Sequence, residues 1–456
     1  MADIEKRLNK AAVKKAVDWG TAVDTDAAGM GFLPLNPGAP KAAVQMMEDE
    51  SYGAFETNLD VGSINPSDFG LDFDYRWDGR ENLLLAILMG TAGLPGMYFI
   101  VSNANHHIDF EEAAGGEKNA VLTNGTYTAT AICTEIKTRL EALSNGVLTY
   151  TVTHDATNRK FTIATSATFK LWWNTGTNNA AAADTLLGFA ADLSGAITYT
   201  SSAAAVGLAL NYLHSFTLKN TAVGLFGTYA TEKGATIHTV PTFKVMKGSF
   251  SVNAGLIKAT FGLRGISVVD DSALPAAFTS TTVDGNTHAR AKFTQAVFQM
   301  NAQTGLDFDG GGADVIRPKS FTLEIERKMD SEHVAGVQTI VEPVENDKPS
   351  VKLTMEFPRM DTANAAYFAE WIAATEKKAD LIITGPAIEG GYNYYLKFQF
   401  PRLVIEDVEY ADSKIIPAKI VLRGVTADSP GPTGMTGLTL PVYVGLMNGR
   451  SADYLA

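Results

Sequence analysis

One cluster of histidines and carboxylates in this chain has the residue types of a metal site. His106 and His107 lie close to Asp109, Glu111 and Glu112 in the sequence. Imidazole nitrogens and carboxylate oxygens are good ligands for transition metals. Adjacent residues on a strand, however, point to opposite faces, so the two imidazoles would not share one ion. We therefore expect a solvated strand edge here and no metal site.

An acidic, glycine-rich stretch could surround a calcium ion. Asp307, Asp309 and Asp314 flank a run of three glycines, and carboxylate oxygens are the ligands that calcium prefers. Their spacing does not follow the twelve-residue calcium-binding loop. The pattern is more typical of an exposed turn, which is the interpretation we favour.

Few residues could support covalent catalysis or ring stacking. Cys133 falls on the apolar face of a predicted helix, where a cysteine is usually a small buried side chain and not a reactive thiolate. His154 and Asp155 would need a neighbouring serine to form a triad, and no pattern supplies one. Trp172 and Trp173 could stack on a sugar or a base, but one ring facing the core and one facing outward is the simpler interpretation.

The motifs that mark common enzyme classes are missing as well. The chain has no phosphate-binding loop, no dinucleotide-binding glycine pattern, no nucleophile elbow and no zinc-protease helix. We therefore expect no catalytic residue and no cofactor. A structural or assembly role is the better hypothesis.

Most of these candidate residues belong to one segment, 94–206, about as long as a whole domain. Its pattern predicts a helix followed by a small group of strands. The predicted elements are a helix over Ala129–Leu143 and strands over Leu148–His154, Lys160–Ala164, Phe169–Trp173 and Ala196–Thr200. The sequence thus predicts an inserted α+β domain.

Length and composition limit the remaining possibilities. The chain has 456 residues, too many for one core, and 46% of them are hydrophobic. Its net charge of −13 argues against a protein that grips nucleic acid through the phosphates. Its longest apolar run, Leu83–Met89, is too short to span a membrane, and residues 1–20 lack the apolar core of a signal peptide. We expect a chain that folds in a cytoplasm without disulfides.

Two parts of the chain repeat the same series of elements. Phe69–Trp77 alternates apolar and polar residues, and an apolar helix over Glu81–Thr91 follows, with Asp78 as its predicted cap. Val351–Phe357 alternates in the same way. A second Arg-x-Asp sequence then precedes a helix over 362–375.

A second pair of segments supports the repeat. Leu256–Gly265 and Ile415–Gly424 both end in Leu-Arg-Gly, and each follows a predicted strand that leads into a turn. Matches in the same order indicate an internal duplication.

The repeat sets the predicted domain boundaries. We expect a first unit over 51–93 and 207–288, split by the insert, and a second unit over 289–425. Residues 1–50, with a helix over Met1–Val17, and residues 426–456 are predicted to be arms. Gly and Thr are abundant, so we expect a mainly β fold with flanking helices.

Several segments resemble the tail tube proteins of long non-contractile-tailed bacteriophages. The resemblance covers roughly residues 50–93 and 207–450. The segments that carry it are Phe73–Gly93, His238–Gly248, Met329–His333, Phe357–Asp361 and Phe400–Tyr410. The insert lies outside it and looks like the β-rich modules added to other phage virion proteins.

The resemblance implies a β-sandwich with a flanking helix, whose sheets join between subunits into a barrel around a channel for DNA. Two units per chain would give a homotrimeric, pseudo-hexameric ring. Rings would stack through arms, including Val268–His288, into the tail of a virion assembled in the host cytoplasm. The partners would be the tape measure, tail terminator and distal tail proteins. Candidate lumen residues are Glu406, Asp407 and Glu409, although a solvated outer face is the alternative for them.

Three other functions stay open. The chain could be another virion or surface protein, such as a capsid decoration. It could be a contractile-type secretion tube protein. The insert could also bind a carbohydrate or act as an enzyme, through His106 or His107 and Trp172 or Trp173.

Overall fold

The computed structural model describes most of the chain and confirms the mainly β class. Seventeen strands are linked into one hydrogen-bonded network, which does not close on itself among the described residues. The described residues are 11–25, 31–32, 40–41, 43–48, 59–77, 79, 81–91, 96–112, 115–144, 148–207, 212–233, 236–253, 255–270, 290–308, 314–360, 365–389, 392–410, 418–450 and 454–455.

The first of two similar units is a four-stranded antiparallel sheet with a helix packed on it. Its strands lie in the order β14 (Gly227–Lys233), β15 (Thr236–Asn253), β16 (Lys258–Gly265) and β5 (Ser67–Asp74). The helix is α1 (Glu81–Met89), and all nine of its residues are buried, as its apolar sequence predicts. The Glu81 carboxylate accepts a hydrogen bond from the amide of Arg76, while the predicted cap Asp78 lies outside the described residues.

The second unit has the same arrangement. Its strands lie in the order β23 (Lys377–Glu389), β24 (Tyr392–Tyr410), β25 (Ala418–Gly424) and β22 (Ser350–Phe357). The helix α4 (Ala366–Ile372) follows β22 as α1 follows β5, and it packs on β24 as α1 packs on β15.

The register is also the same in the two units. Leu263 pairs with Phe69 where Leu422 pairs with Leu353, and Ala259 pairs with Phe73 where Ala418 pairs with Phe357. The register therefore aligns Phe73 with Phe357. The Arg-x-Asp match between the two halves is consequently wrong by one residue.

Even the irregularities recur. β15 and β24 each shift register beside a proline, Pro241 and Pro401, and again at the next bulge, Met246 and Glu406. A proline has no amide hydrogen, so within a sheet it is tolerated at a bulge.

One further strand joins the two units. β19 (Ser320–Glu326) pairs with β15 on one side and with β22 on the other. The result is a continuous antiparallel sheet in the order β5, β16, β15, β19, β22, β25, β24. Buried side chains from both units and from α1 form a single core behind this sheet.

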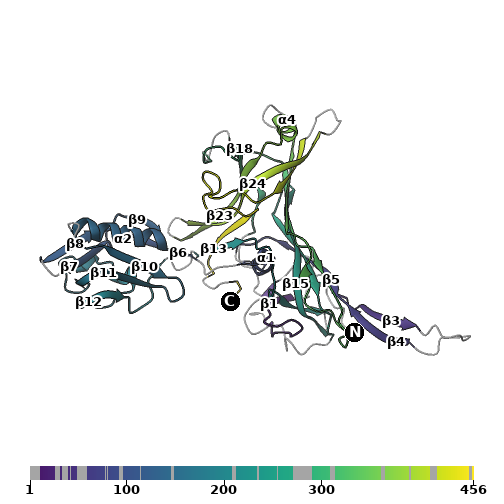
Figure 1. Ribbon diagram of the computed structural model, residues 1–456, viewed down its shortest axis with the longest axis horizontal. Coiled ribbons are helices and arrows are strands. Elements are labelled where there is room, and N and C mark those ends of the chain that lie inside the picture. The colour runs from purple at the N-terminus through teal and green to yellow at the C-terminus, as the bar shows by residue number, and fades with distance from the viewer. Residues whose placement is uncertain are drawn as a thin grey trace, which may run out of the picture.

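The predicted insert has its own hydrophobic core, built from residues between Met97 and Tyr212. Helix α2 (Ala129–Leu143) has the predicted bounds, and Figure 1 shows the lobe standing apart from the body, attached through β6. The other elements are β6 (Gly96–Val101), β7 (His107–Glu112), β8 (Glu117–Val121), β9 (Gly125–Thr128), β10 (Tyr150–Asp155), β11 (Lys160–Leu171), α3 (Asp184–Leu187) and β12 (Leu193–Thr200).

Both predicted arms are partly wrong. Residues 11–15 form a strand, β1 (Ala11–Lys15), and not a helix, because pairing with β14 and burial of Ala11 to Val13 outweigh the helical spacing. In the C-terminal segment, β26 (Tyr443–Asn448) lies buried between β13 (Tyr212–Thr217) and β24. Val268–His288 lies mostly outside the described residues.

The remaining strands are short, apart from one projecting hairpin. β3 (Ala43–Glu48) and β4 (Leu59–Asn65) form a two-stranded ribbon that leaves the body at the N-terminal end of β5 (Figure 1). The others are β2 (Gly31–Phe32), β17 (Ala296–Ala302), β18 (Val315–Ile316), β20 (Met329–Asp330) and β21 (Val344–Glu345).

Candidate functional site

The carboxylates beside His106 and His107 are already paired within the insert. Glu112 accepts hydrogen bonds from Lys118 and Tyr150, and buried Asp109 accepts two from Asn178. The Lys170 ammonium hydrogen-bonds Glu111 and holds the pKa of that carboxyl below its usual range. Among the described residues, no group of three or more histidine, cysteine, aspartate or glutamate side chains could hold a metal ion.

The acidic loop around Asp307 already has a cation beside it. The fully buried Lys378 donates hydrogen bonds to the carbonyl oxygens of Gly305, Leu306 and Thr433. Its ammonium also attracts Asp307 and Asp314. A lysine in this place supplies the positive charge that a calcium ion would supply. The third carboxylate of the predicted cluster, Asp309, lies outside the described residues.

The aromatic and histidine candidates of the insert serve its packing. His154 lies against the rings of Phe99 and Phe161, and burial lowers the pKa of this imidazole, which favours its neutral form. Trp173 is buried and stacked on Phe189, whereas Trp172 is half-buried with the Lys170 ammonium 5.3 Å from its ring centre. One tryptophan faces inward and one outward, as predicted.

The thiol of Cys133 should react slowly. Burial raises its pKa to about 11, from an ordinary value of 9.0. Only the thiolate attacks alkylating reagents, so the reactive fraction at pH 8 should fall by about 100-fold. We expect iodoacetamide to label the native protein far more slowly than the urea-unfolded protein, as mass spectrometry would measure. Equal rates would contradict the burial of this thiol.

The described features that point to a function are the two open edges of the continuous sheet. β5 pairs with β16 on one side, and no other described strand pairs with its second edge. β24 pairs with β23 only as far as Leu403, so the same edge of Asp407–Tyr410 has no described partner. Unpaired edges are sites where another chain can add a strand.

The repeat shows what belongs at such an edge. By register, Asp407 corresponds to Lys247 and Tyr410 to Phe250. In the first unit this stretch of β15 is not open, because β19 pairs along it from Lys247 to Asn253. Within one chain the first unit therefore continues into the second, while the second unit ends in an open edge of the same form.

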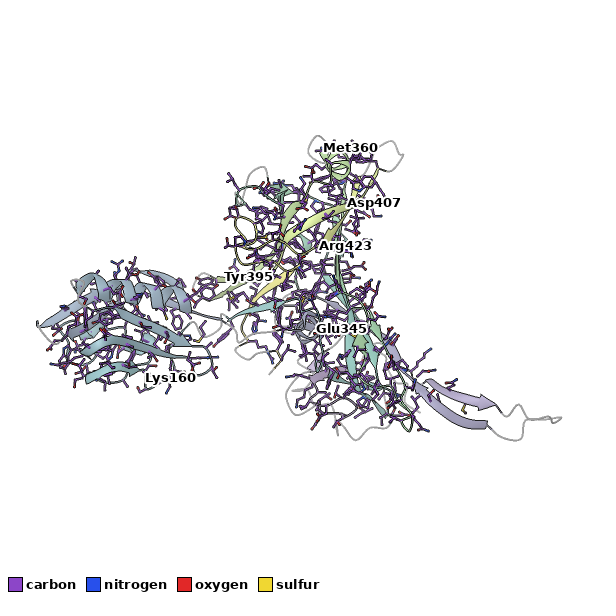
Figure 2. The ribbon with its side chains drawn as sticks, in the orientation of Figure 1. Lys160, Glu345, Met360, Tyr395, Asp407 and Arg423 are labelled. Atoms are coloured by element: carbon purple, nitrogen blue, oxygen red, sulfur yellow. The ribbon has the colours of Figure 1, made fainter. Side chains whose placement is uncertain are left out.

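The outward face of the continuous sheet is polar. Asp407 and Arg423 lie on its neighbouring strands β24 and β25 (Figure 2). Its carboxylates outnumber its cations. The exposed or half-buried charged residues of this face are Asp68, Asp72, Asp74, Glu324, Glu326, Glu356, Glu406, Asp407, Glu409, Lys247, Lys258, Arg264, Lys352, Lys419 and Arg423.

Cross-strand ion pairs connect many of these charges. Glu409 accepts a hydrogen bond from Lys419 at 3.0 Å, which lowers the pKa of this carboxyl. Glu406 lies 3.5 Å from Arg423, and Lys247 lies 2.7 Å from Glu324. The three candidate lumen residues thus belong to one polar face, but two of them have cationic partners. Sequence alone gave no signal for these partners, because the pairing register sets them.

Comparison with protein families and with curated protein sequences identifies no relative. No protein-family model and no curated protein sequence matches the chain. Among the described residues, no helix is long and apolar enough to cross a membrane.

Proposed function

We propose that this chain is a structural protein that assembles into stacked rings and forms the tail tube of a bacteriophage, through which DNA leaves the virion. The observation that carries the proposal is the junction between the two repeated units. β19 joins them into one sheet inside the chain, and no described strand pairs with the corresponding edges at the two ends of that sheet.

The same junction, repeated between copies, would close a ring. The open edge of β24 in one copy would join, through a strand N-terminal to β5, to the β5 edge of the next copy. Each chain contributes two units, so three copies would give six units around the axis. Such a head-to-tail contact generates a closed ring when its rotation divides a full turn.

The polar face of the sheet would line the channel. A wall with excess cations would bind the phosphates of DNA through counterion release and would hold the duplex in place. Most lysines and arginines of this polar face are paired with carboxylates of neighbouring strands, and carboxylates are in excess on the face. DNA could pass along such a wall without being retained.

The β3–β4 hairpin is suited to a contact between stacked rings. A two-stranded ribbon alone in water is at best marginally stable. This one projects from the body with the apolar side chains of Val44 and Met46 exposed. The insert lobe lies on another side of the body, where it would project from the ring. Other tail proteins would bind at the two ends of the tube.

Negative-stain electron microscopy of the purified chain at high concentration tests the proposal. We expect rings or stacked tubes with a central channel and three outer projections, one for each insert. Six projections would contradict the two-unit ring. A chain that stayed monomeric at high concentration, even when seeded with preformed tail ends, would favour a decoration role instead.

A further inference from the structure

Helix α4 differs from α1 in one respect that the repeat makes informative. All nine residues of α1 are buried, whereas in α4 only Tyr367 is buried. In α4, Phe368 is 43% exposed and Ile372 is 71% exposed. The second unit therefore leaves uncovered an apolar helix face that the first unit covers.

The segment after β19 caps the C-terminal end of α1. The Arg327 side chain is fully buried and donates to the carbonyl oxygens of Leu88 at 2.6 Å and Met89 at 3.2 Å. It also donates to the carbonyl oxygen of Lys219 and lies 3.4 Å from Glu345. A cation at this place satisfies the last carbonyls of a helix and complements its dipole.

Helix α4 has no such cap among the described residues. The carbonyls of Ile372 and Ala373 lie at the C-terminal end of α4, as those that Arg327 binds lie at the end of α1. No described group donates a hydrogen bond to either oxygen, and the last turn of α4 has no basic residue. Among the described residues, the end of α4 thus has neither the cation nor the burial that the end of α1 has.

The chain contains a second segment placed like the one at Arg327. Arg327 lies two residues before β20, whose hairpin with β21 leads into β22. Lys41 lies two residues before β3, whose hairpin with β4 leads into β5. Lys41 is exposed, and its amide donates to Ser67 at the start of β5, so this segment runs beside the open β5 edge.

We propose that Lys41 and its neighbours in one copy dock on the exposed face and C-terminal end of α4 in another copy. The contact must be between copies, because α4 and the β3–β4 hairpin lie at opposite ends of the body (Figure 1). Met360 marks the α4 end in Figure 2. The inference rests on the proposed ring and specifies which residues seal the junction between its subunits.

Photo-crosslinking tests this contact directly. A benzophenone amino acid replaces Ile372 in ¹⁵N-labelled protein, which is mixed with unlabelled protein at high concentration. Mass spectrometry should find a crosslink to an unlabelled peptide that contains Lys41. The same group at Ile197, which is 51% exposed on β12 of the insert, is the control and should give no such crosslink.

Substitution gives an independent readout. Ile372→Asp should weaken self-association by at least ~10-fold, as charged substitution at a buried contact does, while Ile197→Asp should not. Both side chains are exposed in the single chain, so thermal unfolding of the monomer should not change. If rings form but the crosslink joins Ile372 to another peptide, the proposed contact is wrong. The same holds if Ile372→Asp self-associates as tightly as the wild type. In both cases the ring proposal stands. If the wild type forms no rings and gives no crosslink, both proposals fail.

Discussion

Replacing Arg327 by methionine should lower the free energy of unfolding by about 3–5 kcal/mol, the cost typical of removing one partner from a buried ion pair. The methionine keeps much of the volume but removes every donor. The carbonyl oxygens of Leu88, Met89 and Lys219 would be left without this cation, and the Glu345 carboxylate, whose side chain is only 4% exposed, would lose its counter-charge. Urea unfolding followed by tryptophan fluorescence measures the change.

A second arginine in an ion pair provides the matched control. Arg423 lies 3.5 Å from Glu406, but its side chain is 58% exposed. Water screens such pairs, so Arg423→Met should cost no more than about 1 kcal/mol. Equal losses in the two variants would contradict the larger contribution that burial gives to the Arg327 ion pair.

The local elements of this fold could be predicted from the sequence, and their long-range partners could not. The apolar run of α1 and the amphipathic pattern of α2 predicted nearly correct bounds because helical periodicity is local. The repeat was visible because Leu-Arg-Gly ends β16 and β25, strands with the same neighbours in both units.

The errors come from residues whose state depends on distant strands. Residues 11–15 have helical spacing but pair with β14, and residues 443–448 follow a Pro- and Gly-rich stretch but fill a gap between β13 and β24. The candidate interface was missed for the same reason. Nothing near Lys41 or Ile372 marks them, and only the comparison of two aligned units shows that one lacks the cover the other has.

Removal of the whole insert should leave a folded body. Met97 and Tyr212 are paired residues of the antiparallel strands β6 and β13, so the two ends of the insert lie side by side. A two-residue Asn-Gly turn can join such a pair. We expect that replacing residues 98–211 by Asn-Gly costs the body little more than the ring contact between Tyr98 and Tyr392, about 0.5–1.5 kcal/mol, because the rest of the insert packs around its own core.

The separated parts should behave as two cooperative units. Calorimetry of the full chain should show two transitions, and the shortened chain should keep one of them. The isolated segment 96–212 should retain the helical signal of α2. In the microscope, rings of the shortened chain should lack the three outer projections but keep their diameter. If the shortened chain is folded but forms no rings while the full chain does, the insert is part of the ring contact, and its placement as an outward domain is wrong.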